Sequence, residues 1–365
     1  MRVLHVTEAL GGGITTAILA MVESTPDIEH HLLARARAEH DVGLDTAARV
    51  RSTTDLPRGP VAALRAIRAA VRRTRPDVVH AHSSIAGALA RSADLDGVPV
   101  VYSPHCFAFE RTDISALRRG AYSAIERALA SQTDVFAAVA PHELDLAAAL
   151  GHEHLAYVPN RTIAADRPRA RFGRPLRIAA VGRLSAQKDP AAFVRLSRYV
   201  RTHLGVPTEW TWIGGGESQQ EQTLRDAGIE VTGWVPHDRL LGRLATQQIY
   251  VHTAAWEAAP ISILEAASLG LPMAVRSITA LDSLQVPGRR HGLQPLADRI
   301  AELTSPTEWS YAQEDSLSFS ARHGRARQYE HLWDLYTAAI GAPPLMLDQP
   351  GPVAPSAPTA VREAS

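Results

Sequence analysis

The stretch ADRPRARFGRPLRIAAVG (Ala165–Gly182) divides the sequence into two halves that follow the same pattern. Its first part, Ala165–Pro175, is rich in Arg and Pro, which is typical of a connection between folded units. Its second part, Leu176–Gly182, is a short apolar run that ends in glycine, as expected of a buried strand. We therefore predict a linker at residues 164–175 and a second folding unit that begins at residue 176.

Short apolar runs alternate with helical patterns on both sides of this division. The strand candidates are Arg2–Thr7, His31–Ala34, Asp77–Ala81, Pro99–Ser103, Asp134–Ala140 and Leu155–Val158 before it, and Leu176–Gly182, Glu209–Ile213, Ile229–Thr232, Ile249–Thr253 and Pro272–Arg276 after it. Continuously apolar strands that alternate with helices predict an α/β fold of two Rossmann-like, doubly wound parallel-sheet domains. Ligands bind beyond the carboxyl ends of such strands, so two facing sheets would form a cleft.

The predicted domains cover residues 1–163 and 176–305. Residues 306–341 are predicted to be helical, and these helices either stay with the second domain or cross back to the first. The last segment, Ala342–Ser365, contains six prolines and little periodicity, so we expect a disordered tail.

Composition excludes several classes of protein. Lys and Arg total 38 and Asp and Glu total 38, and this balance argues against a nucleic-acid-binding protein. The single cysteine, Cys106, cannot form an internal disulfide or a cysteine-based metal site. No apolar run approaches the roughly 18 residues that span a bilayer, and the N-terminus enters a predicted strand directly rather than a signal peptide. We expect a soluble, cytoplasmic protein.

The segment WEAAPISILEAASLGLPMAV (Trp256–Val275) carries two carboxylates, Glu257 and Glu265. A helix is predicted to begin at Pro260–Ser262, so that Glu265 lies in its first two turns and Glu257 on the loop before its positive end. In these places the two carboxylates can accept hydrogen bonds from two sets of sugar hydroxyls. The alternative is that neither binds a sugar: Glu265 would be an ordinary solvated helix residue, and Glu257 an acid that stabilises the start of the helix.

The segment VGRLSAQKD (Val181–Asp189) follows the first strand of the second domain. Its Arg183 and Lys188 are suited to clamp a diphosphate, which carries about two negative charges. Ser185 is predicted to cap the next helix, whose amides would face the same phosphates. The alternative is a pair of ordinary surface charges.

In this order the two segments resemble the E-x7-E and GR-L-x-x-x-K-D signatures of the family 4 glycosyltransferases, which are retaining enzymes of the GT-B fold. Ala258 replaces a customary Gly, and Met273-Ala274 replaces a pair of valines. The resemblance implies that Glu257 contacts the donor sugar and Glu265 the ribose of the nucleotide. It also implies that no divalent ion is needed. Since no carboxylate is placed as a covalent nucleophile, we expect front-face displacement, in which the leaving phosphate accepts the proton of the acceptor hydroxyl.

Other stretches resemble the same family. WIGGGES (Trp212–Ser218) resembles the family's G-x-G-x turn, and VTGWVP (Val231–Pro236) resembles the loop beside the nucleotide base. LGGGITTAIL (Leu10–Leu19) resembles the family's N-terminal glycine loop; it is not a dinucleotide fingerprint, because it lacks the third glycine. YVPNRT (Tyr157–Thr162) resembles the family's V-P-N-G stretch and makes Asn160 a site candidate, although Arg161 replaces the usual Gly. The donor-binding residues implied by the resemblance are Gly12, Gly13, Gly182, Gly214, Gly215, Trp234, Val235, Ile261, Ser262 and Glu265.

The segment VVYSPHCFAFERTD (Val100–Asp113) resembles the P-H-G-x-x-F-L-R segment of polysaccharide-building members of the family. The resemblance implies that His105 approaches the donor sugar and joins Arg183, Lys188 and Glu257 as a catalytic residue, although Cys106 replaces the usual Gly. We expect Thr15, His82 and Phe107 to lie on the acceptor side. His80 and His82 have a spacing seen in zinc sites, but no third ligand is evident, and we expect no metal.

A row of arginines lies along the helix predicted at Val61–Thr74. These arginines are Arg65, Arg68, Arg72, Arg73 and Arg75. They form either a solvated face or a contact with anionic lipid, where each charge contributes about 1 kcal/mol. The lipid contact would hold a cytoplasmic protein at the membrane.

The expected function is retaining hexosyl transfer from a UDP- or GDP-linked sugar, a co-substrate rather than a cofactor, to a glycan or lipid-linked acceptor in cell-envelope assembly. The alternatives are a small natural-product acceptor, a nucleotide-sugar epimerase and a non-catalytic nucleotide-sugar-binding protein. Residues 276–300 lack the family's usual pattern, so the donor sugar stays unassigned.

Overall fold

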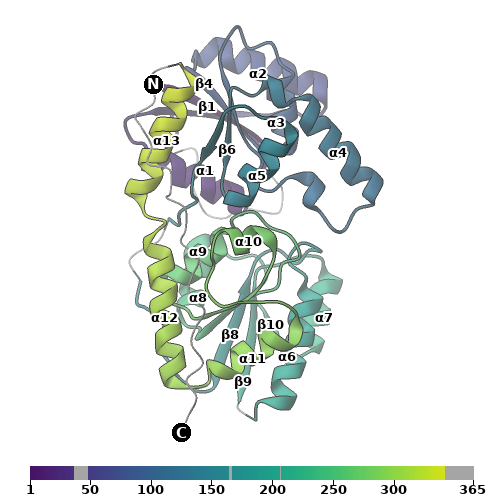
Figure 1. The fold of residues 1–365 in the computed structure, drawn as a ribbon, viewed down its shortest axis with the longest axis vertical. Helices are drawn as coiled ribbons and strands as arrows, with labels where there is room; N and C mark the ends of the chain where they lie inside the picture. Colours follow the sequence, from purple (N-terminus) through teal and green to yellow (C-terminus); the bar gives the residue numbers. More distant parts are fainter. Residues whose placement is uncertain (37–47, 164–166, 206, 342–365) are drawn as a thin grey trace.

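The computed structural model describes residues 1–36, 48–163, 167–205 and 207–341, which fold into two α/β domains, one above the other in Figure 1. The tail predicted at residues 342–365 and the first part of the predicted linker, residues 164–166, lie outside the described residues.

The first domain is built on a parallel sheet of seven strands in the order β3-β2-β1-β4-β5-β6-β7. The strands are β1 (Arg2–Leu10), β2 (Glu29–Ala36), β3 (Ser52–Asp55), β4 (Val78–His82), β5 (Val100–Ser103), β6 (Val135–Ala138) and β7 (Leu155–Tyr157). The strand order reverses between β1 and β4, and a crevice forms at such a switch point. The sequence did not predict β3, because this edge strand reads Ser-Thr-Thr-Asp and lacks an apolar run.

Helices cover both faces of this sheet, as a doubly wound domain requires. They are α1 (Gly13–Ser24), α2 (Pro60–Thr74), α3 (Ser84–Arg91), α4 (Ala116–Ala128) and α5 (Pro141–Leu150), with short 3-10 turns η1 (Ala108–Glu110) and η2 (Ala130–Gln132). Ala63 and Ile67 of α2 and Ala86 of α3 pack in one core with Tyr102 and Phe136. Helix α1 packs on the opposite face.

Helix α4 projects from the domain (Figure 1) and exposes most of its surface. Its buried anchor is Glu126, which accepts hydrogen bonds from Arg91 at 2.7 Å and from the Tyr102 hydroxyl at 2.9 Å. Leu117 and Ile125 are 84% and 47% exposed. The helix therefore presents apolar side chains to solvent.

The second domain contains a parallel sheet of six strands in the order β10-β9-β8-β11-β12-β13. The strands are β8 (Leu176–Val181), β9 (Thr208–Ile213), β10 (Glu230–Val231), β11 (Ile249–His252), β12 (Met273–Arg276) and β13 (Arg289–Arg290). The helices are α6 (Pro190–His203), α7 (Ser218–Asp226), α8 (His237–Ala245), α9 (Ile261–Ser268), α10 (Thr279–Ser283) and α11 (Leu293–Glu302). Two apolar cores lie against this sheet, so both domains have the predicted doubly wound architecture.

The last two helices connect the domains. Helix α12 (Pro306–Ala321) packs on the second domain, where the Trp309 indole donates to the Gln248 carbonyl at 2.8 Å. Helix α13 (Arg325–Ala339) packs on the first domain, where Leu332 and Tyr336 are buried with Val3. The chain thus crosses back to its first domain (yellow in Figure 1), the second of the two arrangements left open by the sequence.

Among the helices of the described residues, none combines the length and the apolar character that a bilayer crossing needs.

Candidate functional site

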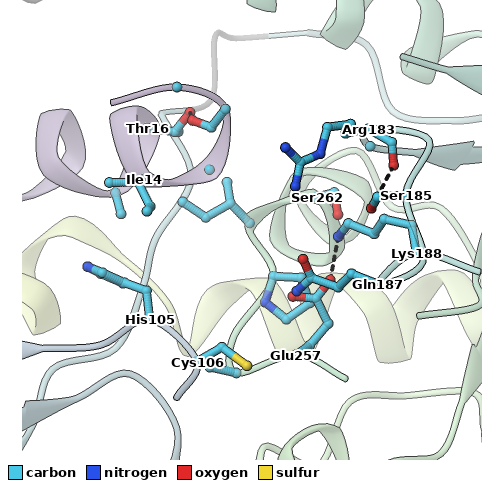
Figure 2. A pocket seen from close by; sticks show the side chains of 18 of the residues that line it. Ile14, Thr16, His105, Cys106, Arg183, Ser185, Gln187, Lys188, Glu257 and Ser262 are labelled. Atoms are coloured by element: carbon cyan, nitrogen blue, oxygen red, sulfur yellow. Dashed lines mark hydrogen bonds and ion pairs between the residues drawn. The ribbon is translucent and has the colours of Figure 1, made fainter. Parts of the chain in front are cut away.

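A cavity of about 540 Å³ lies between the two domains. Loops at the carboxyl ends of β1, β5, β8, β9 and β11 line it, together with the start of α9. Figure 2 shows His105 and Cys106 contributed by the first domain and Arg183, Lys188 and Glu257 by the second.

Most of the predicted site residues line this cavity. They are Gly12, Gly13, His105, Phe107, Gly182, Arg183, Lys188, Gly214, Trp234, Val235, Glu257, Ile261, Ser262 and Glu265. Thr15, His82 and Gly215 do not line it, and Thr16 does so in place of Thr15. Phe107 borders the cavity, but its side chain is fully buried in the first domain's core and stacks on Phe136, so the ring is not exposed to solvent as an acceptor-binding surface.

The two strongest sequence motifs meet through an ion pair. Lys188 Nζ lies 2.5 Å from Glu257 Oε1, and the Glu257 side chain is buried. The loops that carry them are tied together, because the Thr253 hydroxyl donates to the Lys188 carbonyl at 2.8 Å and Ala255 N donates to the Gln187 carbonyl at 2.8 Å. A cation and a carboxylate therefore face the cavity as one preorganised unit.

Arg183 is the exposed cation of this wall. In the described part of the chain its guanidinium has no hydrogen-bond or ion-pair partner, and it points into the cavity (Figure 2). An unpaired guanidinium beside the Lys188–Glu257 pair can bind the oxygens of a diphosphate in bidentate fashion.

The prediction that Ser185 caps the following helix is wrong. Helix α6 begins at Pro190, and its N-cap is Asp189, whose side chain accepts from Ala192 N at 3.0 Å. Pro190 favours this start, since its fixed φ suits the first helical position. Ser185 instead bonds the Arg183 carbonyl at 3.4 Å.

Two glycines allow the loops after β8 and β9 to touch. Gly214 has φ +136°, and a Cβ atom there would lie 2.2 Å from the Gly182 carbonyl oxygen. Gly182 has φ +142°, and its Cβ would lie 2.9 Å from Lys188 Cε. Both positions therefore require glycine, which brings the backbone close to the proposed phosphate site.

Glu265 is already hydrogen-bonded on one side. His237, the first residue of α8, lies with its Nε2 2.6 Å from Glu265 Oε1. Burial lowers the pKa of His237, but the hydrogen bond and charge of Glu265 outweigh it and raise this pKa above its ordinary value. The sequence reasoning missed His237, and its position directly after the VTGWVP stretch is the signal that could have found it.

His105 lies on a strained turn after β5. His105 and Cys106 have φ +53° and +94°, and the Cys106 position is the one where the family usually has Gly. Buried Glu143 of α5 holds this turn, since its carboxylate accepts from Cys106 N and from Val139 N, each at 2.8 Å. Burial raises the pKa of Glu143 to about 7, although both hydrogen bonds oppose this shift. Burial also raises the pKa of the Cys106 thiol, which disfavours a thiolate nucleophile.

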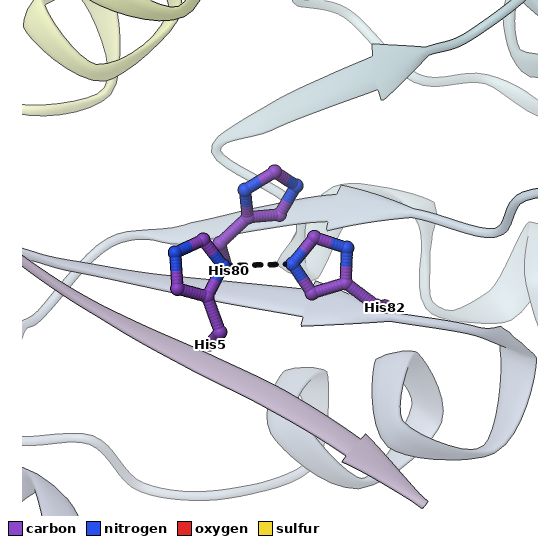
Figure 3. A group of neighbouring side chains, drawn as sticks. All are labelled: His5, His80 and His82. Atoms are coloured by element: carbon purple, nitrogen blue, oxygen red, sulfur yellow. Dashed lines mark hydrogen bonds between the residues drawn. The ribbon is translucent and has the colours of Figure 1, made fainter. Parts of the chain in front are cut away.

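The pairing of β1 with β4 brings a third histidine to the His80–His82 pair (Figure 3). The sequence reasoning missed His5, because it lies on another strand, 75 residues before His80. Every ring nitrogen of the three is hydrogen-bonded to a protein group, to His30, His105, Tyr336, Ser103 or another histidine of the group. In this arrangement no nitrogen lone pair of the three is left for a metal ion.

Comparisons with known proteins agree with this geometry. Residues 12–161 match the glycosyl transferase 4-like domain family, and residues 175–305 match the glycosyl transferases group 1 family. A curated "uncharacterized 41.2 kDa protein in cps region" of Klebsiella pneumoniae is 22% identical over 306 residues, 77% of this chain and 82% of that protein. The Escherichia coli UDP-Gal:alpha-D-GlcNAc-diphosphoundecaprenol alpha-1,3-galactosyltransferase is 27% identical over 246 residues, 59% of this chain and 61% of that enzyme.

Solved structures share the fold. Anabaena Alr3699/HepE in complex with UDP and glucose superposes with a TM-score of 0.70 at 15% identity, over 91% of this chain and 98% of that chain. WaaG, a glycosyltransferase involved in lipopolysaccharide biosynthesis, superposes with a TM-score of 0.67 at 14% identity, over 92% and 100%. The predicted GT-B architecture is thereby confirmed.

Proposed function

The chain belongs to the family 4 glycosyltransferases of the GT-B fold, and from this premise we propose that it transfers a sugar from a UDP-linked donor to a lipid-linked glycan of the cell envelope. Transfer would proceed with retention of the anomeric configuration and without a metal ion. The observation that carries the proposal is the meeting of Arg183, Lys188, Glu257 and Glu265 in one cavity between the domains.

The charges in the cavity support a division of roles along the donor. Glu265, with one oxygen engaged by His237, would bind the ribose hydroxyls through its other oxygen. Arg183 and Lys188 would bind the diphosphate, and Glu257 would bind the sugar hydroxyls. The two cations would stabilise the charge that develops on the leaving phosphate, which is the work a divalent ion does in other transferases.

Retention is proposed through displacement on the front face of the sugar. Glu257 is ion-paired with Lys188, which suits a carboxylate that binds hydroxyls better than one that attacks carbon. The leaving phosphate would accept the proton of the acceptor hydroxyl while Arg183 and Lys188 hold it in place.

The relatives favour UDP and a lipid-linked acceptor over the other choices. The Escherichia coli relative is named for UDP-Gal and a diphosphoundecaprenol-linked sugar, and the Klebsiella pneumoniae relative for the cps region. A small natural-product acceptor is the second candidate.

A lipid-linked acceptor would bring the protein to a membrane surface. Helix α2 offers the exposed arginines Arg65, Arg68, Arg72, Arg73 and Arg75. Helix α4 offers exposed Leu117, Tyr122 and Ile125 together with Arg118 and Arg127, and so combines apolar and cationic side chains as interfacial helices do. The turn η1 joins α4 to the His105 segment, so we propose α4 as the main contact and α2 as an electrostatic aid.

The test begins with thermal-shift measurements against UDP-, GDP-, ADP- and TDP-sugars. A donor at 100 times its dissociation constant stabilises the protein by about 2.7 kcal/mol. We expect the largest shift with a UDP-sugar, and stabilisation by another nucleotide class alone would overturn the choice of UDP.

The second step incubates the best donor with lipid-linked and small-molecule acceptors. We expect transfer to a lipid-linked acceptor that survives a chelator. Epimerised donor without acceptor would identify an epimerase instead, and donor binding without transfer to any acceptor would indicate a non-catalytic protein. Activity lost to the chelator and restored by magnesium would contradict metal independence.

A further inference from the structure

Four histidines form an unbroken hydrogen-bonded row that runs from the end of α1 to the cavity. His30 Nδ1 lies 3.0 Å from His5 Nε2, and His5 Nδ1 lies 2.9 Å from His82 Nε2. His82 Nδ1 then lies 2.9 Å from Nε2 of His105, which lines the cavity. Figure 3 shows the middle link, between His5 and His82. The first three histidines come from neighbouring strands β2, β1 and β4, so the sheet itself fixes their spacing.

The rings meet edge to edge, as hydrogen bonds between imidazoles require. Successive rings are inclined by 27°, 25° and 18°, and their centroids lie 5.1, 5.2 and 5.2 Å apart. Because the N···N distances are much shorter than these separations, each bond runs close to the ring planes, where the N–H bonds and lone pairs lie.

Each ring carries one proton near neutral pH. Burial lowers the pKa of His30 and of His105 to about 4, and it lowers the pKa of His5 and His82 well below the ordinary value. A neutral imidazole has one N–H donor and one acceptor nitrogen. The direction of one hydrogen bond therefore sets the direction of all the others in the row.

The end of the row at Thr25 sets that direction. The Thr25 hydroxyl donates to the Met21 carbonyl at 2.8 Å, so it can only accept from His30 Nε2, 2.9 Å away. The Thr25 carbonyl, 3.3 Å from the same nitrogen, is also an acceptor. His30 Nε2 must therefore carry the proton, and His30 Nδ1 accepts from His5 Nε2–H.

The same assignment passes along the row. His5 Nδ1 accepts from His82 Nε2–H, and His82 Nδ1 accepts from His105 Nε2–H. His105 Nδ1 then keeps its lone pair, and in the described part of the chain this atom has no hydrogen-bond partner.

We propose that His30, His5 and His82 are positioning residues that fix the tautomer of His105, keeping its proton on Nε2 and presenting the Nδ1 lone pair as a hydrogen-bond acceptor to a hydroxyl of the donor sugar. The identity of that hydroxyl rests on the proposed function, whereas the tautomer does not. The row orients His105 and conducts no proton, because a carbonyl that cannot become a base ends it at Thr25.

His80 lies beside the row and has its own partners. The Ser103 hydroxyl donates to the Ala137 carbonyl at 2.8 Å, so it accepts from His80 Nε2, and the Tyr336 hydroxyl donates to His80 Nδ1 at 2.9 Å. A metal ion bound by His5, His80 and His82 would break these hydrogen bonds. Metal binding at this cluster is therefore a competing hypothesis, and the NMR experiment described next distinguishes it from the proposal.

The test is the ¹⁵N NMR spectrum of the full chain labelled at histidine, recorded without donor at neutral pH. We expect His105 to show a protonated Nε2 and an unprotonated Nδ1. The opposite tautomer, a mixture of the two, or a stoichiometric metal whose removal shifts these signals would overturn the proposal.

Three variants connect this tautomer to catalysis. His30→Leu removes the end of the row and should scramble the His105 tautomer and lower kcat by about tenfold to hundredfold, with little change in KM for the donor. His30→Gln should restore the His105 tautomer and kcat, because the glutamine amide can accept a hydrogen bond from His5 and donate one to Thr25. His31→Gln is the matched control, since His31 bonds Ser52 and Glu29 on the other face of the same strand.

The outcomes separate the two proposals. A scrambled tautomer with unchanged kcat in His30→Leu, or equal losses in His30→Leu and His31→Gln, would overturn the positioning role. Should His30→Leu fail to fold, the His105 tautomer measured in the wild-type protein and in His30→Gln still tests the proposal. The expected tautomer in a protein that transfers no sugar would overturn the proposed function and leave the tautomer assignment intact.

Discussion

Lys188 Nζ and Glu257 Oε1 lie 2.5 Å apart and join two loops that are 69 residues apart in the sequence. The Glu257 side chain is 9% exposed and that of Lys188 18%, so removal of either leaves a poorly solvated charge behind. Arg183, beside them, is exposed and unpaired in the described part of the chain. The two cations proposed to hold the diphosphate therefore differ in what their loss does to the fold.

Arg183→Ala should lower turnover by about 10²–10³ and leave the melting temperature unchanged, because it removes one electrostatic partner of the leaving phosphate. Steady-state kinetics with thermal unfolding measures both. Arg198→Ala, on the exposed face of α6, is the control. A folded Arg183→Ala protein with near-normal turnover would remove this residue from the clamp.

Lys188→Ala should lose a similar factor in turnover and also destabilise the protein by about 1–3 kcal/mol, since Glu257 is left buried without its donor. Denaturant unfolding at pH 7 checks this cost. Unchanged stability would mean that the ion pair does not hold the two loops together.

Gly214→Ala should destabilise the second domain by at least about 2 kcal/mol, because its Cβ would strike the Gly182 carbonyl and its φ is positive. Gly13→Ala is the matched variant: nothing lies within 4 Å of its Cβ, so stability should persist. Thermal unfolding of both variants decides, and equal melting temperatures would contradict the close contact of the two loops.

Stability should fall as the pH drops from 6.5 toward 4. Burial lowers the pKa of His30 to about 4, so below pH 6.5 the unfolded chain binds a proton that the folded chain does not. His5, His80 and His82 shift in the same direction. Each such histidine raises the free energy of unfolding by about 1.4 kcal/mol per pH unit across this window.

Glu143 acts in the opposite sense. Its pKa is raised to about 7 in the folded protein, so the folded chain holds a proton that the unfolded chain releases, and this stabilisation is lost as the pH rises through that value. The histidines outnumber it, so the net stability should still rise from pH 4.5 to 6.5. Denaturant unfolding between pH 4.5 and 7.5 measures the slope, and His30→Gln should reduce it. A flat profile would show that these histidines are not buried in the neutral form.

Leu117→Ser with Ile125→Ser should weaken binding to anionic lipid vesicles at least tenfold, because each exposed apolar side chain contributes about 1.5–3 kcal/mol when fully buried. Arg68→Gln with Arg72→Gln on α2 should weaken binding less and mainly at low salt. Vesicle co-sedimentation compares the two pairs. A larger loss from the α2 pair would make α2 the main contact instead.

The sequence predicted the alternation of strands and helices because the central strands of both sheets are continuous apolar runs. Edge strand β3 escaped prediction because its Ser-Thr-Thr-Asp residues lack such a run. The crossing of α13 could not be decided, because its partners lie far back in the chain: Tyr336 bonds His80, 256 residues earlier, and Leu332 is buried with Val3 of the first strand.

The candidate site was predictable where one local motif carried the chemistry, as for Arg183, Lys188, Glu257 and Glu265. It was not predictable where the partner lay on another element. His5 meets His82 only through the pairing of β1 with β4, and Glu143 supports the His105 turn from α5. Such contacts depend on strand order, which local patterns do not encode.

The most direct test of the central claim is the anomeric configuration of the product, followed by ¹H NMR as the wild-type protein converts an α-linked UDP-sugar and its acceptor. The account predicts release of UDP and a new anomeric proton with the small coupling constant of an α linkage. A product with the large coupling constant of a β linkage would contradict it.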